Sequence, residues 1–189
     1  MGMKITKENI LKYAQKYDKD YKQKSKKTED RMKSLLKNQR YLTLKNLITI
    51  GDWKAPRARR HYSSSQNCND RVKQISQFSF GTRDEKARME SLLGRKGGLR
   101  GVYYPVASTI LHFALPNAYP IMDFRVLRSL SLWNGKQHIR YNFRLWERYC
   151  NKIRAIAKKY RLPIRTVDKV LWKYDELNSG KRKTCGQKK

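Results

Sequence analysis

The chain has 189 residues, of which 39% are hydrophobic, so it is long enough to bury a core. It carries 45 Lys and Arg against 15 Asp and Glu, a net charge of +30. Such a charge favours a polyanionic partner, above all nucleic acid, over a ribosomal or acidic-membrane surface. The sequence contains no membrane-spanning apolar run and no signal peptide, which predicts a cytoplasmic protein, nucleoid-associated in a bacterium.

The three cysteines, Cys68, Cys150 and Cys185, lie far apart and form no CxxC pair. This spacing favours neither a zinc site nor a disulfide framework, so we expect no metal and no cofactor. We also expect a monomer.

Residues 1–40 are expected to form a basic helical N-terminal segment, with apolar residues from Ile5 to Tyr17 at helical spacing. The polar stretch 18–30 is either a solvated helix or a flexible link. A second helix is predicted from about Glu29 to Arg40.

Residues 41–178 are expected to form one all-α domain. Thr43 is expected to cap a short helix, Leu44 to Ile50, which either ends at Gly51 or continues for a further turn over residues 52–54. A break follows over 51–62, then a helix over 69–80 and another capped by Thr82. Residues 94–98 form a basic, glycine-rich break.

Pro105 is expected at the first position of a helix that runs to Ala114, apolar nearly all round and therefore central. Asp123 is expected to cap a helix from Phe124 to Leu132. A long helix over 141–160 and a last helix that begins at Arg165 or Thr166 follow, and the basic tail 179–189 is expected to be disordered.

The segment Leu99-Arg100-Gly101-Val102, followed by Ala107, has the form of a helix-hairpin-helix turn. A glycine turn that enters a helix directs several backbone N–H groups at one point, which makes an anion site. Such a turn holds a DNA phosphate without reading sequence. Nearby charge comes from Arg95, Lys96 and Arg100. An ordinary corner between two helices is the alternative.

Residues 99–130 resemble the helix-hairpin-helix DNA glycosylase superfamily, the endonuclease-three-like group. That family has a G-V-G-x-x-x-A hairpin and then P-x-x-x-P-[IV]-x-D, whose aspartate caps the next helix. This chain has Gly101-Val102, Ala107 and Pro116-Asn117-Ala118-Tyr119-Pro120-Ile121-Met122-Asp123. The resemblance implies a compact helical glycosylase-like fold around the hairpin.

The resemblance also implies that Asp123 is catalytic and that duplex DNA with a flipped nucleotide is the substrate. A carboxylate beneath C1′ stabilises the positive charge that develops on the sugar. Two positions depart from the family pattern, because Tyr103 replaces the second hairpin glycine and Pro105 replaces the lysine of members that also cut the strand. The implied enzyme excises a base by hydrolysis, without lyase activity.

Trp53 is the predicted base-stacking residue, since it stands in a break rich in basic residues. Phosphate contacts are expected there from Lys54, Arg57, Arg59 and Arg60. A Trp that anchors the loop to the core, with the arginines in solvent, is the alternative. Tyr103 and Tyr104 are candidates to fill the gap left by a flipped base.

Arg125 is expected to pair with Asp123 or with a phosphate, and Asp168 is expected either to support an arginine such as Arg125 or to lie exposed. A third arginine, Arg128, is expected on a solvated or salt-bridged helix face. Helical spacing favours a core position for three further residues, His112, Trp146 and Trp172.

Two other functions stay open from sequence alone. The same fold can bind DNA without catalysis, with Asp123 as an N-cap only. A basic RNA-binding or ribosome-associated protein is the other. The sequence does not name the excised base or distinguish repair from removal of unusual bases in foreign DNA.

Overall fold

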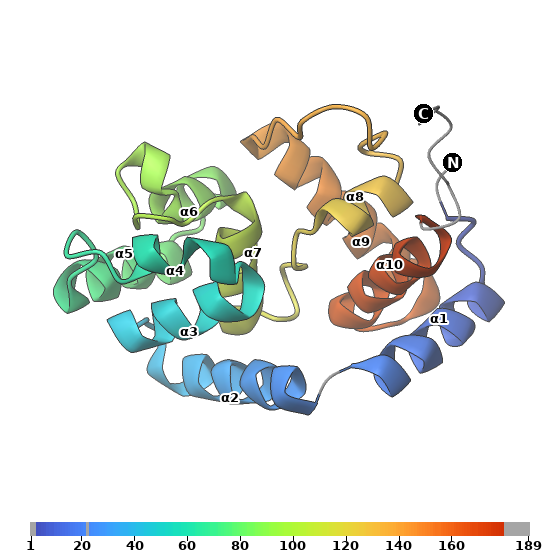
Figure 1. Cartoon of the computed structure of the whole chain (residues 1–189), viewed down its shortest axis with the longest axis horizontal. Helices are drawn as coiled ribbons and strands as arrows, with labels where there is room; N and C mark the ends of the chain where they lie inside the picture. Colours follow the sequence, from blue (N-terminus) through green and yellow to red (C-terminus); the bar gives the residue numbers. More distant parts are fainter. Residues whose placement is uncertain (1–2, 22, 180–189) are drawn as a thin grey trace, which may run out of the picture.

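The computed structural model describes residues 3–21 and 23–179, and the expected disordered tail lies almost entirely outside them. The described part is helical and contains no strand, which confirms the all-α class (Figure 1). Its α-helices are α1 (Lys7–Asp20), α2 (Gln23–Gln39), α3 (Leu44–Lys54), α4 (Arg59–Tyr62), α5 (Asn69–Gly81), α6 (Glu85–Leu92), α7 (Tyr104–Ala114), α8 (Phe124–Ser129), α9 (Phe143–Tyr160) and α10 (Ile164–Ser179).

The helices form two groups (Figure 1). Helices α2 to α7 make one group, and α1 with α8, α9 and α10 makes the other. Residues 115–123 connect α7 to α8 and lead the chain from the first group to the second. The N-terminal helices join both groups, because α1 packs on α10 and α2 packs on α7.

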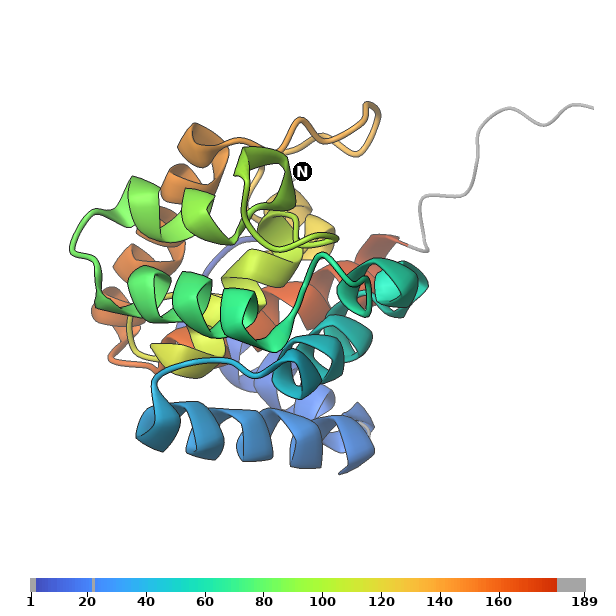
Figure 2. The ribbon, with the colours of Figure 1, turned by 90° about the vertical axis from the view of Figure 1, so that its left-hand side faces the viewer.

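Helix α7 is the interior helix of its group, and residues 106–113 are all buried. Figure 2 shows it behind α5 and α6. The apolar character of this helix on every side therefore predicted its central position correctly.

Helix α2 begins at Gln23, six residues before the predicted start, so most of the polar stretch 18–30 is helical. Glu29, Met32 and Leu36 recur at helical spacing and are buried. One buried face is sufficient to hold a helix whose other positions are polar.

Helix α3 begins as predicted, because Thr43 and Asn46 form a capping box. Gly51 does not end the helix, which continues over residues 52–54 to Lys54, the second of the two predicted ends. Gly51 is present for packing: a Cβ there would lie 2.4 Å from Cδ2 of Tyr62. The missing side chain lets the aromatic ring lie against the helix backbone.

Two other helix ends differ from the prediction. Asp84, rather than Thr82, caps α6, because its Oδ1 accepts hydrogen bonds from the N–H groups of Lys86 and Ala87 at 2.8 and 3.0 Å. Helix α8 ends at Ser129 rather than Leu132, since Ser131 adopts a left-handed φ of 54°.

Helices α9 and α10 also begin at different residues from those predicted. Helix α9 begins at Phe143 rather than Tyr141, because Asn142 accepts a hydrogen bond from the N–H of Leu145 at 2.9 Å. Helix α10 begins at Ile164, directly after a proline.

His112 lies in the core, as predicted, and its Nδ1–H donates to the carbonyl of Tyr119 at 2.7 Å. Burial lowers its pKa to about 3, and the positive charges of Arg165 and Lys33 add to this effect. The histidine is therefore neutral in the folded protein at neutral pH.

Lowering the pH from 7.5 to 5.0 is expected to reduce the free energy of unfolding by about 2 kcal/mol through His112. The unfolded chain binds a proton below an ordinary histidine pKa of 6.5, whereas the folded chain does not until about 3. Urea denaturation across this pH range measures the slope. His112→Asn should remove it and His138→Asn, an exposed control, should not; an unchanged slope in His112→Asn would contradict the assignment.

Candidate functional site

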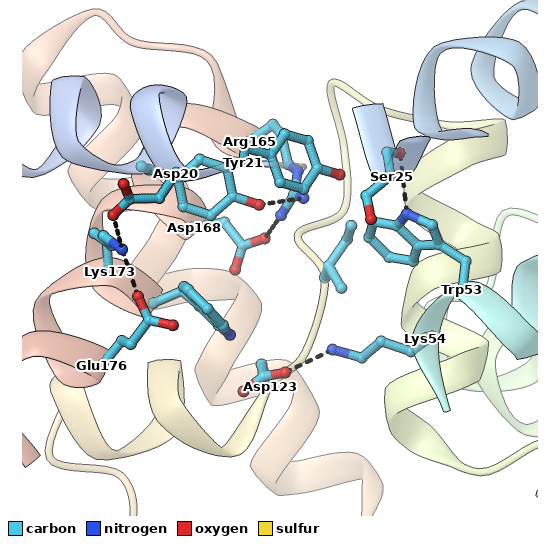
Figure 3. A pocket seen from close by; sticks show the side chains of 13 residues that line it. Asp20, Tyr21, Ser25, Trp53, Lys54, Asp123, Arg165, Asp168, Lys173 and Glu176 are labelled. Carbon is cyan, nitrogen blue, oxygen red and sulfur yellow. Dashed lines mark hydrogen bonds and ion pairs between the residues drawn. The ribbon is translucent and has the colours of Figure 1, made fainter. Parts of the chain in front are cut away.

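A cavity of about 390 Å³ lies between the two groups of helices (Figure 3). Aromatic rings and charged side chains line it together. The lining residues are Tyr17, Asp20, Tyr21, Ser25, Trp53, Lys54, Ile121, Asp123, Arg165, Asp168, Trp172, Lys173 and Glu176. Its size is that of pockets that hold small aromatic ligands.

Asp123 lies in this cavity at the start of α8, and its predicted role as N-cap is confirmed. Its Oδ1 accepts the backbone N–H of Arg125 at 3.0 Å. Its Oδ2 accepts a hydrogen bond from Nζ of Lys54 at 2.8 Å, and the aspartate side chain keeps 20% of its surface exposed. One carboxylate oxygen thus caps the helix and the other is in an ion pair at the cavity.

The carboxyl group of Asp123 is ionised at neutral pH. Burial raises its pKa, but the Lys54 ammonium and the hydrogen bonds from Lys54 and Arg125 together hold that pKa below its ordinary value. An ionised carboxylate is the form that stabilises positive charge on a bound ligand.

Trp53 lines the same cavity, so the structure brings together the two residues that the sequence singled out separately. It lies in the last turn of α3 and not in a loop, which corrects the prediction. Its Nε1–H donates to the carbonyl of Ser25 at 3.1 Å, and its ring lies edge-on to Phe113. These contacts fix the ring in place at the cavity wall.

Trp172 also lines the cavity and is half-buried, whereas helical spacing predicted a core position. It contacts Tyr17 edge-on, with 5.8 Å between ring centroids. Trp146, by contrast, is fully buried in the core as predicted. Helical spacing predicts that Trp146 and Trp172 lie on the inward faces of their helices. It does not distinguish a position in the core from one on the wall of a cavity.

Beside the cavity, a buried ionic network joins α2 to α10. The guanidinium of Arg165 donates to both oxygens of Glu29 at 2.9 and 3.0 Å and to Asp168 at 2.6 Å. The hydroxyl of Tyr149 lies 2.9 Å from the second oxygen of Asp168. Burial raises the pKa of Asp168 although Arg165 favours its charged form.

The predicted ion pair between Arg125 and Asp123 is wrong, because the Arg125 side chain pairs with Asp175 at 3.7 Å. Asp168 is buried and supports an arginine, as expected, but that arginine is Arg165 rather than Arg125. The Arg125 guanidinium lies 5.2 Å from the ring centroid of Trp172, beside the cavity wall.

Arg128 binds the same carboxylate, Asp175, and therefore lies on a salt-bridged face as expected.

The glycine turn from Gly94 to Val102 is closed by its own backbone. The N–H of Gly94 donates to the carbonyl of Val102, and the N–H of Val102 to that of Leu99, both at 3.0 Å. Asn67, fully buried, holds the turn from outside by bonding both the N–H and the carbonyl of Arg100. The turn is therefore rigid before any ligand binds.

A second cavity, of about 580 Å³, opens at this turn, away from Asp123. Its lining is basic and rich in backbone: His61, Gln66, Arg71, Gly94, Arg95, Gly97, Gly98, Arg100, Gly101 and Tyr103. Backbone groups and arginines around a hollow are the features that bind a phosphate.

Gly101→Ala is expected to destabilise the fold by about 2–5 kcal/mol. Gly101 has a left-handed φ of 83°, and a Cβ there would lie 2.6 Å from Cβ of His61. The matched control is Gly97→Ala, with φ of 81° and open space, which should cost about 1–2 kcal/mol. Chemical denaturation compares the two, and equal costs would show that close packing at Gly101 is unimportant.

Tyr103 and Tyr104 separate in the structure. Tyr103 is 48% exposed and has a φ of −116°, which any residue adopts, so the fold does not require glycine there. Tyr104 is buried in the core, so its expected role as a wedge is wrong.

The predicted basic residues lie in three places. Arg95 lies over the Tyr103 ring at 5.3 Å, Arg100 bonds Gln66, and Lys96 lies 3.9 Å from Glu90. Arg57, Arg59 and Arg60 lie in a 3₁₀ turn (Pro56–Ala58) and α4 rather than in a loop, and Arg59 pairs with Asp52. Lys54 is in the Asp123 cavity, apart from these groups.

Several lining residues were missed by sequence reasoning. Tyr17 has the spacing of a core residue, and Tyr21 lies in a polar stretch. The sequence marks Arg165 only as a possible helix start. Each lines the Asp123 cavity because helices distant in sequence pack together there, and such packing leaves no local pattern in the sequence.

Among the described residues, no group of three or more His, Cys, Asp and Glu side chains is arranged to hold a metal ion. None of the helices in that part of the chain combines the length and apolar character needed to cross a bilayer. Comparison with protein-family models, curated proteins and solved structures finds no match. Any function must therefore be derived from the two cavities and their residues.

Proposed function

We propose that the protein is a DNA N-glycosylase that takes a flipped nucleotide into the cavity between its two groups of helices. The observation that supports this most is the placement of an ionised Asp123 and the Trp53 ring at one cavity. Enzymes that act on a base in DNA extrude it and stack it between aromatic side chains. Four aromatic rings border this cavity: Tyr17, Tyr21, Trp53 and Trp172.

Outside the Asp123 cavity, the proposal assigns DNA binding to the turn at Gly94–Val102, to Tyr103 and to the basic surface. The hollow at the turn from Gly94 to Val102 holds a phosphate, and Arg95 and Arg100 supply the positive charge. Tyr103 is exposed beside that turn, and in this proposal it contacts the duplex. The net charge of +30 supplies attraction for DNA without sequence preference.

In the proposed reaction the C1′–N bond of the flipped nucleotide breaks, and its electron pair leaves with the base. Positive charge develops on C1′ and the ring oxygen, and the Asp123 carboxylate stabilises it. Water then adds to C1′ and its proton passes to the departing base, which leaves an abasic sugar and the free base. The aromatic walls hold the base during this step.

Base release is tested with duplexes that each carry one alkylated, deaminated, oxidised or hypermodified base. Hot alkali after incubation cuts the strand wherever a base was removed. We expect alkali-dependent cleavage of at least one of these duplexes. Binding to all of them without cleavage of any would contradict the enzyme assignment.

A non-enzymatic DNA-binding protein is the second candidate. The observation in its favour is that both oxygens of Asp123 already have partners, one in the cap and one in the ion pair. Binding measured against salt, on DNA and on structured RNA of equal length, tests the partner class. A preference for RNA would contradict both DNA functions.

A further inference from the structure

An exposed aromatic residue begins α8, directly after Asp123, and it does not line the cavity that contains that aspartate. This residue is Phe124, which is 41% exposed. The ring of Trp133, which is half-buried, lies edge-on to it with 6.3 Å between the ring centroids. Trp133 belongs to the loop between α8 and α9, at the edge of its group of helices (Figure 1). Two aromatic rings thus lie together at the surface.

Two guanidinium groups lie beside these rings. That of Arg125 is 5.4 Å from the ring centroid of Phe124, and that of Arg128 is 5.9 Å from the centroids of both rings. The buried carboxylate of Asp175 holds both cations, because it accepts a hydrogen bond from Nε of Arg128 at 2.6 Å and lies 3.7 Å from Nη1 of Arg125. Neither guanidinium covers the centre of the Phe124 ring, since atoms in direct contact are about 3.5–4.0 Å apart. The cations are therefore fixed in place while the ring stays accessible.

The loop that carries Trp133 adds positive charge and no negative charge. Residues 131–142 contain Lys136 and Arg140, both exposed, and contain no aspartate or glutamate. The loop closes on itself at Trp133, whose Nε1–H donates to the carbonyl of Gln137 at 2.7 Å. The aromatic rings therefore lie in basic surroundings, on a loop held by its own contacts.

We propose that this surface binds single-stranded DNA, with an unpaired base stacked on the Phe124 ring and the flanking phosphates beside the arginines. We call it the α8 surface, and it consists of Phe124, Arg125, Arg128 and Trp133. The α8 surface lies outside the cavity and requires no base release, so it is a binding site beyond the proposed function. Only the choice of DNA over RNA rests on that function, because the α8 surface begins next to Asp123.

The chemistry of the α8 surface determines which partner fits it. Every nucleobase has a flat π face that stacks on an aromatic ring, and in a duplex the neighbouring base pairs cover that face. A base must therefore be unpaired to reach Phe124. Fixed arginines and a basic loop beside the ring suit the phosphates that flank such a base. A ring that only packed the loop onto α8 would be buried, as that of Trp146 is in the core, yet Phe124 is exposed.

The test measures the affinity of the full chain for a fluorescent single-stranded DNA of about ten nucleotides, by fluorescence anisotropy. Salt at about 200 mM weakens the phosphate contacts made elsewhere on this basic protein. Phe124→Ala is expected to weaken binding by about 5–150-fold, which corresponds to the loss of one stacked base. Phe124→Tyr keeps an aromatic ring and should bind as the wild type does.

The matched control is Phe78→Ala on α5. Phe78 is 55% exposed, and within the described part of the chain no cation lies over its ring. The control removes an equally accessible phenyl ring outside the α8 surface, so the affinity should not change. Urea denaturation checks that both alanine variants fold. An equal loss of affinity in Phe78→Ala and Phe124→Ala would overturn the proposal.

A strand without bases tests stacking directly. Tetrahydrofuran residues in place of every nucleoside keep the phosphates and remove the bases, so Phe124→Ala and the wild type should bind this strand equally. The same loss on both strands would show that Phe124 acts on phosphate contacts or on folding, and would overturn the proposal. Unchanged binding of the normal strand by Phe124→Ala, or tighter Phe124-dependent binding of RNA than of DNA, would also overturn it.

These measurements are separate from those of base release. If Phe124→Ala has no effect on single-stranded binding while duplexes still lose a base, the α8 surface is contradicted and the glycosylase proposal stands. Phe124-dependent stacking without release of any base would support the α8 surface and contradict the glycosylase proposal.

Discussion

Asp123→Asn is expected to lower the rate of base release by about 10²–10³-fold, with folding and DNA binding retained. Asparagine keeps the shape of the side chain and caps a helix as well as aspartate does. It removes the negative charge that stabilises the sugar cation. Single-turnover rates of alkali-sensitive cleavage measure the loss.

The control for this variant is Asp84→Asn, which makes the same change at the N-cap of α6. Asp84 accepts two backbone N–H groups there, so both variants test the same capping interaction. Normal rates are expected for Asp84→Asn. Equal rates for Asp123→Asn and wild type would show that Asp123 is an N-cap only.

Arg165→Met is expected to destabilise the fold by about 3–5 kcal/mol. The substitution leaves Asp168 buried without a cation and leaves Glu29 with Lys33 as its remaining cation. It also separates α2 from α10 at the edge of the cavity, so base release should fall as well. Urea denaturation at pH 7 measures the stability.

Two comparisons test whether unpaired buried charge causes the loss of stability in Arg165→Met. Arg59→Met removes a pair with Asp52 in which the arginine side chain is 65% exposed, and it should cost about 0–1 kcal/mol. With Glu29→Gln and Asp168→Asn already present, Arg165→Met should cost less than in the wild type, because no carboxylate is left unpaired. An equal loss of stability in both backgrounds would show that lost packing around Arg165, and not unpaired charge, causes the destabilisation.

Local patterns were sufficient to predict most of the helices and part of the site. The apolar run of α7 and the cap at Asp123 are properties of neighbouring residues, and both were predicted correctly. Gly51 shows where local signals fail. A glycine that would end a helix is instead required by the ring of Tyr62, which packs against it in the folded chain.

The pairing of charges could not be predicted, because it depends on how helices lie against one another. Lys54 and Asp123 are 69 residues apart in sequence. Arg125 was expected near Asp168, yet it pairs with Asp175, two helical turns further along α10. A chain with this many basic residues offers every carboxylate several partners, and only the packed structure selects among them.

The order in which the chain is made has a consequence for the two cavities. The turn at Gly94 to Val102 and its partner Asn67 lie within the first 102 residues, whereas the walls of the Asp123 cavity extend to Glu176 in α10. During synthesis from the N-terminus, the turn proposed to hold a phosphate emerges well before the last wall of the Asp123 cavity. A chain stopped before α10 would contain every residue of this turn but would lack the cavity wall that α10 supplies.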